Sequence, residues 1–447
     1  MKPASRPQRL ALLATERERL QAHLRDRYPA ERRWRERARE LRRVAIVVGS
    51  PRGGTSVVHH LLRSAAGAVA PLGEHRPLFT LAGWNFPDAT RELECIEDMP
   101  LAPGEREALL DEIAFECWGE PNLEPSAEQR LRFAWSWALR FQLQWPDLGA
   151  DLEWVAERVE AVVAALQKRG IELGGENVTA AALRALLDSG VPLDPHLYAL
   201  ADRLRRDLFT DVPESGPPRG GTILEIPPFL AAGPRHRPRP ATAGTLVLKA
   251  SSDAHRLPTL RRLFAGRQVH WLHLTRNPLA VVNGLLDGWA HRGFWQHDLT
   301  ELTEPGIAHA PRDRHLWCFD LFPGWREHLN GSLDDLCLEQ WLHPHSRILT
   351  HLGPEQRVTR VRFEEFLAGG RMRTNLLVRM AEGLGLTSSA RYMTVAHRPA
   401  IINATVAPAP ARWLSARPGL LSLLSEDRVA AMAVRLGYTP KEAFEWD

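Results

Sequence analysis

The sequence contains very little lysine and no long apolar run. Only four lysines occur among its 447 residues, and arginine supplies the other basic side chains: Lys2, Lys168, Lys249 and Lys441. A lysine inside the body of the chain is therefore unusual and is a candidate for a specific task. No stretch approaches the ~18 consecutive apolar residues that a membrane-spanning helix needs. The sequence predicts a soluble protein without a membrane span.

Cysteine is also scarce, and no targeting segment is readable. The four cysteines show neither a CxxC pair nor a disulfide-like spacing: Cys95, Cys117, Cys318 and Cys337. The N-terminus is rich in arginine and lacks the apolar segment of a secretory signal peptide. Together these absences predict a location in the reducing cytoplasm.

The net charge of +3 is too small to indicate nucleic acid as the main partner. This charge is unevenly distributed, because residues 1–43 hold fourteen basic against six acidic side chains. The sequence predicts that 1–43 is a charged helical arm, interrupted near Tyr28-Pro29. Such an arm is typical of a solvated helix or of a contact between subunits in a homo-oligomer, and an acidic partner is the alternative.

The pattern changes at Val44, where Val44–Val48 forms a short β-branched run typical of a buried parallel strand. A glycine-rich turn follows at 49–54, and 55–66 has one apolar helical face. Further strands and helices are expected at 245–249, 268–275, 278–292, 357–363, 373–384 and 426–436. This order predicts an α/β fold of the P-loop type, with a central parallel sheet between two layers of helices.

A large helical insertion interrupts this core. We expect the core to comprise 44–84 plus 245–440, and the insertion to comprise 85–210. The Pro/Gly-rich segment 211–244 reads as a long loop. The insertion is interpreted as a substrate lid or a structural cap. Its tryptophans either line a cleft or form core: Trp118, Trp135, Trp137, Trp145 and Trp154.

Gly49-Ser50-Pro51-Arg52-Gly53-Gly54-Thr55-Ser56 connects the first strand to its helix. Glycines let the backbone approach an anion, and the amides and dipole of a helix N-terminus bind phosphate. In the nucleotide triphosphatase pattern GxxxxGK[ST], Thr55 would stand in the place of the lysine. The positive charge lies instead at Arg52, inside the loop. The sequence therefore predicts phosphate binding without the usual triphosphate lysine.

The segment Pro51–Ser56 resembles the Pro-[Arg/Lys]-x-Gly-Thr-[Thr/Ser] loop of sulfotransferases that use 3′-phosphoadenylyl sulfate (PAPS). The loop of that family cradles the 5′-phosphosulfate of the donor. The resemblance implies that the donor contacts Arg52, Gly53, Gly54, Thr55 and Ser56. It extends over roughly 44–84 and 245–440, and is similar to the bacterial and tyrosylprotein branches.

A second motif supports this resemblance. The strand expected at 268–275 is followed by Arg276-Asn277-Pro278, in which Asn277 can cap a helix. It resembles the family's strand–Arg-[Asp/Asn]-Pro–helix motif, whose Arg and a Ser eight residues later hold the donor's 3′-phosphate. Arg276 matches, but Gly284 stands where the serine is expected, and the side chain of Asn283 is a candidate replacement. Two later segments are also similar to the family: 362–366 and 436–440.

Sulfuryl transfer requires a cation near the leaving oxygen and a base for the acceptor hydroxyl. Arg52 and Lys249 are the candidate cations, and the resemblance implies a lysine at the second position. Many family members carry a histidine two residues after this lysine, where Ser251 stands here. Other branches use a glutamate shortly after the first helix, which implies Glu74 as the base. The alternatives are His75, Asp253 and His255.

No metal site is expected, because His59-His60 and His343-Pro344-His345 lack further ligands at a suitable spacing. The sequence therefore predicts a metal-independent sulfotransferase that uses PAPS and a hydroxyl acceptor on a sugar, small natural product or peptide. A divergent P-loop kinase or nucleotidase is an alternative, although the phosphate lysine and a magnesium carboxylate are not in place. A non-catalytic nucleotide-binding protein is the other, left open by Gly284 and Ser251.

Overall fold

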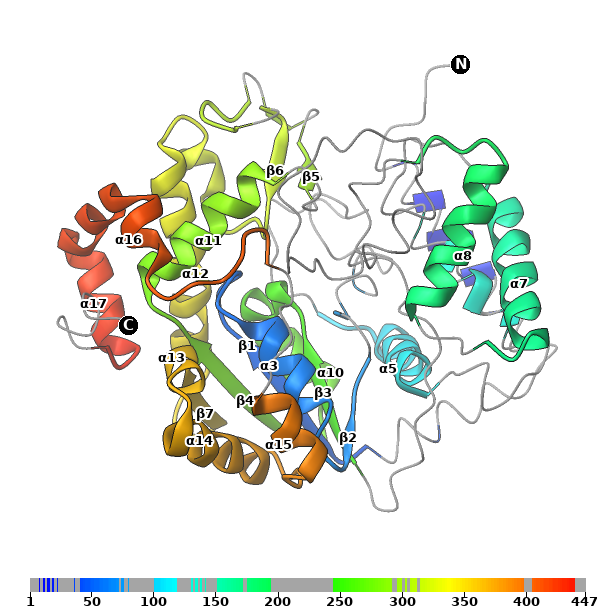
Figure 1. The fold of residues 1–447 in the computed structure, drawn as a ribbon, viewed down its shortest axis with the longest axis horizontal. Coiled ribbons are helices and arrows are strands. Elements are labelled where there is room, and N and C mark those ends of the chain that lie inside the picture. The colour runs from blue at the N-terminus through cyan, green and yellow to red at the C-terminus, as the bar shows by residue number, and fades with distance from the viewer. Residues whose placement is uncertain are drawn as a thin grey trace.

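The computed structural model gives the arrangement of the sheet and most of its helices (Figure 1). It describes individual positions and short stretches, among them Glu74, His75 and Phe79, and the continuous ranges 41–71, 100–118, 151–171, 175–193, 244–291, 296–299, 306–311, 314–397 and 404–438. Three expected segments lie outside the described residues, as does most of the arm: 85–99 and 196–209 of the insertion, and 211–243 of the loop.

The core is a five-stranded parallel sheet with the order β2-β3-β1-β4-β7. Its strands are β1 (Arg43–Val48), β2 (Ala68–Val69), β3 (Thr245–Lys249), β4 (Gln268–Thr275) and β7 (Arg357–Arg362). The predicted parallel sheet is confirmed, with β1, β3, β4 and β7 within one residue of the expected bounds. The two-residue β2 is too short to leave a periodic signal, and the sequence did not predict it.

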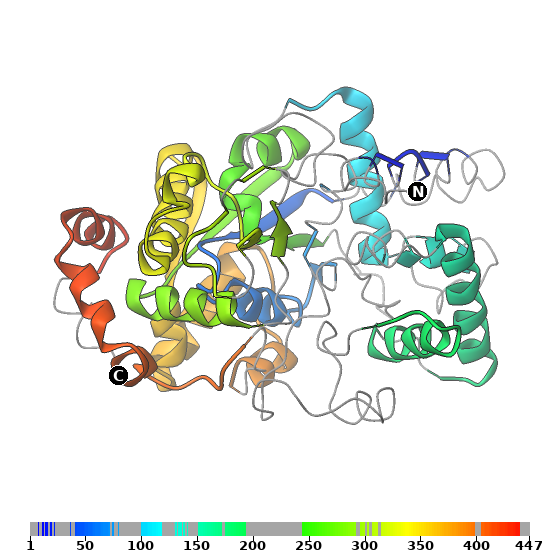
Figure 2. The same ribbon diagram turned by 90° about the horizontal axis from the view of Figure 1, so that it is seen from above.

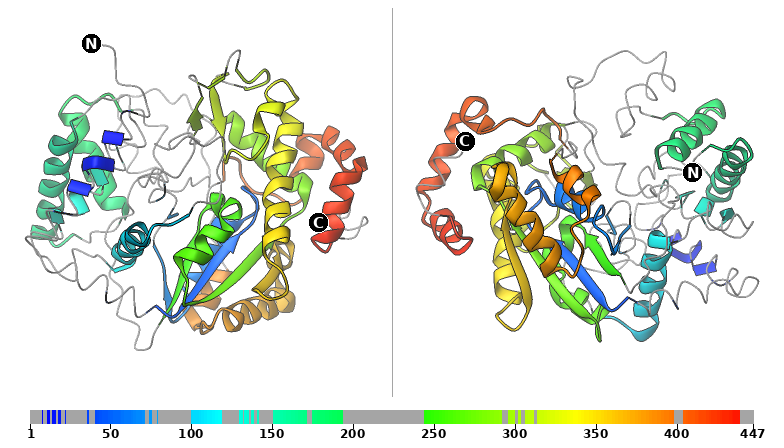
Figure 3. Two further views of the ribbon diagram at one scale, coloured as in Figure 1. Left: turned by 180° about the vertical axis from the view of Figure 1, so that it is seen from behind. Right: turned by 60° about the horizontal axis from the view of Figure 1, so that its bottom comes forward.

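Helices cover both faces of this sheet, as the sequence predicted. Along β1, Ala45 and Val47 pack with α3 (Thr55–Leu62), whereas Val44, Ile46 and Val48 point to the opposite face. The first face is completed by α14 (Gly370–Gly383) and α15 (Ala390–His397), and the second by α10 (Leu257–Leu263) and α12 (Leu333–His351). Figure 3 shows α10 and α12 from behind, and α14 and α15 from below.

The insertion contributes α5 (Pro103–Trp118), α7 (Leu152–Lys168) and α8 (Gly175–Asp188). The side chain of Arg106 attaches α5 to the core by donating to the carbonyls that end α10, including that of Ala265 at 3.0 Å. The pair α7 and α8 lies on the side of the molecule away from the C-terminal helices (Figure 2). Trp137 is fully buried and stacks on Phe141, so this tryptophan belongs to the core.

A third apolar cluster surrounds α11 (Pro278–Ala290), which follows β4. It joins α11 and α12 to the hairpin β5 (Gln296–Asp298) and β6 (Leu316–Cys318), and to the C-terminal elements α16 (Arg412–Ala416), η5 (Pro418–Ser425) and α17 (Asp427–Arg435). The short helix α13 (Phe363–Leu367) packs instead against β7 and α14. Cys117, Cys318 and Cys337 are buried. Within the described ranges, no helix is long and apolar enough to cross a membrane.

The connectivity brings the site segments to one edge. After β1 the chain builds β2 and β3 on one side, and it then crosses to β4 and β7 on the other. In open α/β sheets, ligands bind at the carboxyl ends of the strands where the strand order reverses in this way. The loops that follow β1, β3 and β4 therefore lie at a single edge.

Candidate functional site

The loop after β1 turns sharply into α3. Arg52 has a left-handed backbone with φ 61°, and Gly54, the residue that precedes the helix, has φ 96°. A Cβ atom at Gly54 would lie 2.5 Å from the ring of Phe363, so this position requires glycine on two counts. Because the N-cap is a glycine and the first turn contains no acidic residue, no carboxylate competes there for the helix N-terminus.

Three hydroxyl groups are buried along this loop: Ser50, Thr55 and Ser56. The Oγ of Ser50 has no hydrogen-bond partner among the described residues, although the residue is only 1% exposed. A buried hydroxyl without a partner is costly unless a ligand or water completes it. Together with the N-terminus of α3, Ser50 indicates that the loop receives a polar ligand.

Lys249 ends β3 beside β1 and points to this loop. Its Nζ donates to Ser56 Oγ at 2.7 Å and pairs with the carboxylate of Glu74. Both side chains are largely buried, with 4% and 9% of the Lys249 and Glu74 side chains exposed. The fold thus brings together the predicted cation, a loop hydroxyl and the predicted base, from segments about 175 residues apart.

Arg276 follows β4 directly and supports the loop from the other side. Its NH1 donates to the main-chain oxygen of Arg52 at 3.1 Å, and its guanidinium lies over the ring of Phe363 at 5.0 Å. Asn277 caps α11, as expected, because its Oδ1 accepts from Leu279 N–H at 2.9 Å. Arg276 therefore stands beside both the loop after β1 and the N-terminus of α11.

The side chain of Arg52 points toward α11. Its Nε donates to the carbonyl of Gly284 at 3.1 Å, and its NH2 donates to Thr405 Oγ1 at 3.2 Å. A Cβ atom at Gly284 would lie 3.3 Å from the Cβ of Arg52. Glycine inside a helix costs about 1 kcal/mol relative to alanine. The Arg52 side chain occupies the adjacent space, which gives a physical reason for a glycine here.

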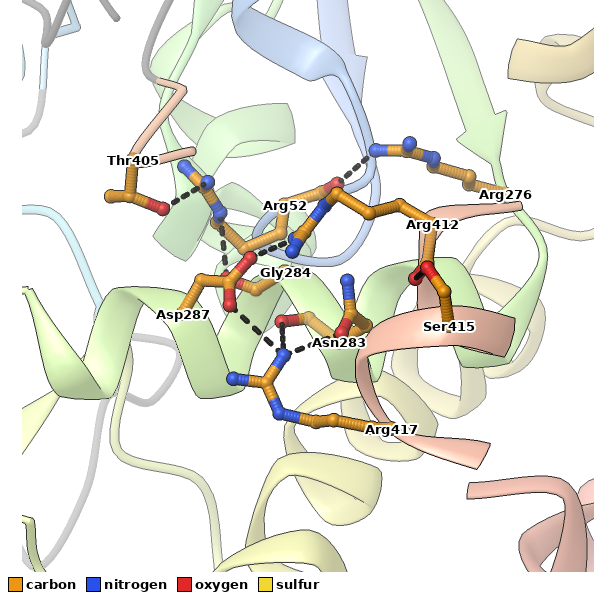
Figure 4. Close-up of polar contacts among 9 residues, drawn as sticks. All are labelled: Arg52, Arg276, Asn283, Gly284, Asp287, Thr405, Arg412, Ser415 and Arg417. Atoms are coloured by element: carbon orange, nitrogen blue, oxygen red, sulfur yellow. Dashed lines mark hydrogen bonds and ion pairs between the residues drawn. The ribbon is translucent and has the colours of Figure 1, made fainter. Parts of the chain in front are cut away.

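Further arginines gather around Asp287 on the next turn of α11 (Figure 4). Arg412 pairs with Asp287 Oδ2, and Arg417 NH1 donates to Asp287 Oδ1 at 2.9 Å. Burial and the nearby Arg276 and Arg412 lower the pKa of Arg52 to about 10, against the opposing effect of Asp287. Burial also lowers the pKa of Arg276. Positive charge is therefore crowded here, and an anionic ligand would relieve it.

Arg412, Arg417 and Thr405 were missed by the sequence analysis. They lie in the C-terminal part of the chain, where no local motif marks them, and only the packing of α16 and η5 on α11 brings them to the site. Asn283 was named as a replacement for the missing serine. Its side-chain oxygen accepts a hydrogen bond from Arg417, and the residue is 3% exposed. Its contact with a donor stays a prediction.

The segments 362–366 and 436–440, which the sequence analysis singled out, contribute residues that pack beside Arg276 and Asn277. Glu364 accepts from Asn277 N–H at 2.7 Å and from Tyr438 OH at 3.0 Å. Burial raises the pKa of Glu364 and that of Tyr438. Phe363 contacts both Arg276 and the position of Gly54. These residues hold the turn after β4 against the loop after β1.

The alternative bases lie close to Glu74 in sequence or in space. His75 is buried, and its Nε2 lies 3.0 Å from Asp253 Oδ1. Burial lowers the pKa of His255 to about 4. Within the described ranges, no group of three or more His, Cys, Asp or Glu side chains is arranged to hold a metal ion. Gly53 belongs to the loop turn, where its N–H donates to Ser50 O at 3.1 Å.

Comparisons with known proteins give weak matches. A scan against protein-family models and a search of curated proteins both give no match. Among solved structures, the chain matches a sulfotransferase domain from the curacin biosynthetic pathway, with a TM-score of 0.36 and 11% identity over 89% of this chain and 99% of that one. It also matches sulfotransferase STF9 from Mycobacterium avium, with a TM-score of 0.32 and 15% identity over 91% and 74% of the two chains. These values are too low to support a function, which must rest on the site itself.

Proposed function

We propose that this protein is a PAPS-dependent sulfotransferase that transfers a sulfuryl group to a hydroxyl acceptor. The observation that carries the proposal is the meeting of Lys249, Ser56 and Glu74 beside the loop after β1. This group combines a cation for the leaving oxygen, a hydroxyl donor and a carboxylate base within one small region. The resemblance of the loop, which includes Arg52 to Ser56, indicates that PAPS is the sulfuryl donor.

The donor has two anionic ends, and two parts of the site suit them. The N-terminus of α3, with Ser50, Thr55 and Ser56, suits the 5′-phosphosulfate. Arg276 and the adjacent Arg52 and Arg412 suit the 3′-phosphate, since their charges already disfavour one another. In this assignment the guanidinium of Arg52 serves the 3′-phosphate, whereas Lys249 is left as the cation at the reacting end.

The reaction follows from these positions. The acceptor oxygen attacks sulfur in line, the bond from sulfur to the bridging phosphate oxygen breaks, and the acceptor proton passes to Glu74. Lys249 neutralises the charge that develops on the departing oxygen. The ion pair with Lys249 favours the ionised form of Glu74, which is the form that a base requires. A positioned base of this kind contributes about 10²–10⁴-fold to the rate.

Calorimetric titration tests the proposal against the kinase alternative. The protein is titrated with adenosine 3′,5′-bisphosphate in the presence of a metal chelator, and separately with ATP and magnesium. We expect tight binding of the bisphosphate and weak binding of ATP. A preference for ATP with magnesium would support a kinase or nucleotidase and would contradict the proposal. Bisphosphate binding without transfer to any hydroxyl would indicate a non-catalytic binding protein.

The acceptor, the compartment and the subunit arrangement stay predictions. In this proposal the acceptor hydroxyl must reach Glu74, whose carboxylate pairs with Lys249. Sugar, small natural product and peptide hydroxyls all fit a carboxylate base. A panel of these three acceptor classes with a radiolabelled donor separates them, because the label appears in the product of the accepted class alone.

A further inference from the structure

The segment after Lys249 carries a buried carboxylate that the proposed reaction does not use. Asp253 lies in the short turn η3 (Ser251–His255) and is 0% exposed. Its Oδ2 accepts from Ala250 N–H at 2.9 Å, and its Oδ1 lies 3.0 Å from His75 Nε2. Buried carboxylates are costly unless they are hydrogen-bonded in this way.

Each of these two contacts involves a residue that is adjacent in sequence to the Lys249–Glu74 ion pair. Ala250 follows Lys249 in the chain, and His75 follows Glu74. One carboxylate therefore binds the residue next to each member of the Lys249–Glu74 pair, across a sequence separation of 178 residues. The two segments meet twice, once through the ion pair and once through Asp253 with His75.

The surroundings of His75 hold its imidazole ring in one orientation and link it to Asp253. A carboxylate accepts hydrogen bonds, so the N–H at His75 Nε2 is the donor toward Asp253. The Nδ1 atom is buried and has no hydrogen-bond partner among the described residues. The ring packs edge-on against Phe79, with centroids 5.3 Å apart. A ring held by Asp253 and Phe79 fixes the backbone beside Glu74.

We infer that Asp253 is a positioning residue that holds Glu74 and Lys249 in register through His75 and the Ala250 amide. The inference rests on the proposed function for its consequence in catalysis. The contact itself is a property of the fold, and it can be tested without any substrate. We call the contacts of Asp253 with His75 and with the Ala250 amide the clamp. Loss of the clamp leaves the loop from Ser50 to Ser56 and the arginines at α11 in place, so donor binding is expected to persist.

The test uses the scarcity of lysine. Protein carrying isotopically labelled lysine has only four side-chain ammonium groups, and the signal of Lys249 is assigned with Lys249→Arg. We expect slow proton exchange at Lys249, because its side chain is buried and paired with Glu74. Asp253→Ala is expected to abolish this slow exchange, whereas Asp253→Asn, which keeps an oxygen for Ala250 N–H, is expected to retain most of it.

Turnover is measured as release of adenosine 3′,5′-bisphosphate from PAPS, with water as the acceptor. A misplacement of about 1 Å costs on the order of 10²-fold in rate, and we expect a loss of this size in Asp253→Ala with unchanged bisphosphate affinity. The order of activity should be wild type, then Asp253→Asn, then Asp253→Ala. His75→Gln, which keeps a donor toward Asp253, should be more active than His75→Leu.

A matched control separates positioning from loss of stability. Asp335→Asn weakens the cap of α12, where Ser332 Oγ donates to the Asp335 carboxylate at 2.6 Å, and it touches neither segment of the clamp. It should leave the Lys249 signal unchanged. The inference is overturned if folded Asp253→Ala retains wild-type exchange and turnover, or if Asp335→Asn alters the Lys249 signal equally. It is also overturned if His75→Gln abolishes turnover with the Lys249 signal intact, since His75 would then be the base.

If wild-type protein binds no bisphosphate, the proposed function fails, whatever the lysine signal shows. If it binds bisphosphate and the lysine signal ignores Asp253, the clamp alone fails. The two failures are therefore distinguished by separate measurements.

Discussion

Two basic regions flank the loop after β1, and they differ in how their charge is balanced. At α11, Arg52, Arg412 and Arg417 stand near Asp287, Arg276 lies beside Arg52, and burial with mutual repulsion lowers the pKa of Arg52. At the end of β3, the single lysine is matched by one carboxylate, Glu74. An excess of positive charge favours holding an anion, whereas a matched pair is suited to moving a proton and compensating a leaving group. The first region is expected to control affinity and the second to control rate.

The largest effect is expected at the matched pair. Glu74→Gln keeps the shape of the side chain but removes its basicity, so turnover should fall by about 10²–10⁴-fold while bisphosphate affinity stays near that of wild type. Lys249→Ala should also lower turnover, because charge on the departing oxygen goes uncompensated. An acceptor with a more acidic hydroxyl should partly rescue the first variant and rescue the second less. Wild-type turnover in Glu74→Gln would remove Glu74 from the mechanism.

The next effect concerns the arginine region. Arg276→Ala removes a charge-assisted contact, of a kind that contributes about 1.5–3 kcal/mol, and should weaken adenosine 3′,5′-bisphosphate far more than adenosine 5′-phosphate. Calorimetric titration with both ligands measures the difference. Equal losses for the two ligands would show that Arg276 does not contact the 3′ end. Asn283→Ala is compared in the same titration, because the Asn283 side chain accepts a hydrogen bond from Arg417.

A smaller effect is expected at Gly284. Gly284→Ala is normally favourable in a helix, but here its Cβ would lie 3.3 Å from Arg52 Cβ and 3.6 Å from Arg52 Nε. The variant should therefore weaken bisphosphate binding by displacing the arginine. The same substitution in an Arg52→Ala background should have little further effect, since contacting residues are not additive. Additive losses in the double variant would mean that the two positions act independently.

The smallest effect is the pH dependence of affinity. The pKa of Arg52 is about 10, and a bound anion favours the charged guanidinium. Affinity for the bisphosphate should therefore fall as the pH rises from about 8 to about 11 through this pKa, and the fall should be smaller in Arg52→Gln. Because the folded-state pKa is lowered, the charged group opposes folding below it, and ligand should raise Tm most at neutral pH. An identical alkaline loss in Arg52→Gln would assign the titration to another group.

The sequence predicted the parts of this molecule that local signals encode. Continuous apolar runs located β1, β3 and β4, and Asn277 with Pro278 located the start of α11, all of which the structure confirms. The contacts of Arg52 with Gly284 and Thr405 carry no such signal, because they depend on how α11 and the C-terminal segments pack. The sequence named Arg52 as a candidate cation for the leaving oxygen, and that role stays a prediction.

The clamp at Asp253 is likewise a contact that local sequence signals do not encode. The sequence named Glu74, His75, Lys249 and Asp253 as separate candidates for chemistry, and nothing in the local pattern joined them. Their pairing follows from the parallel register that places Lys249 beside Val47, next to the loop after β1. Long-range pairing of this kind is set by the sheet, not by the residues on either side of each candidate.

The most direct test of the central claim is single-turnover transfer from PAPS with a radiolabelled sulfuryl group, in the presence of a metal chelator. Wild type, Glu74→Gln and Arg276→Ala are compared with water and the hydroxyl acceptor panel. The account predicts that wild type releases adenosine 3′,5′-bisphosphate and that Glu74→Gln loses this release even when it is saturated with PAPS. It predicts that Arg276→Ala recovers release at high PAPS concentration. Equal release by wild type and Glu74→Gln, or an intact donor bound to wild type with every acceptor, would contradict it.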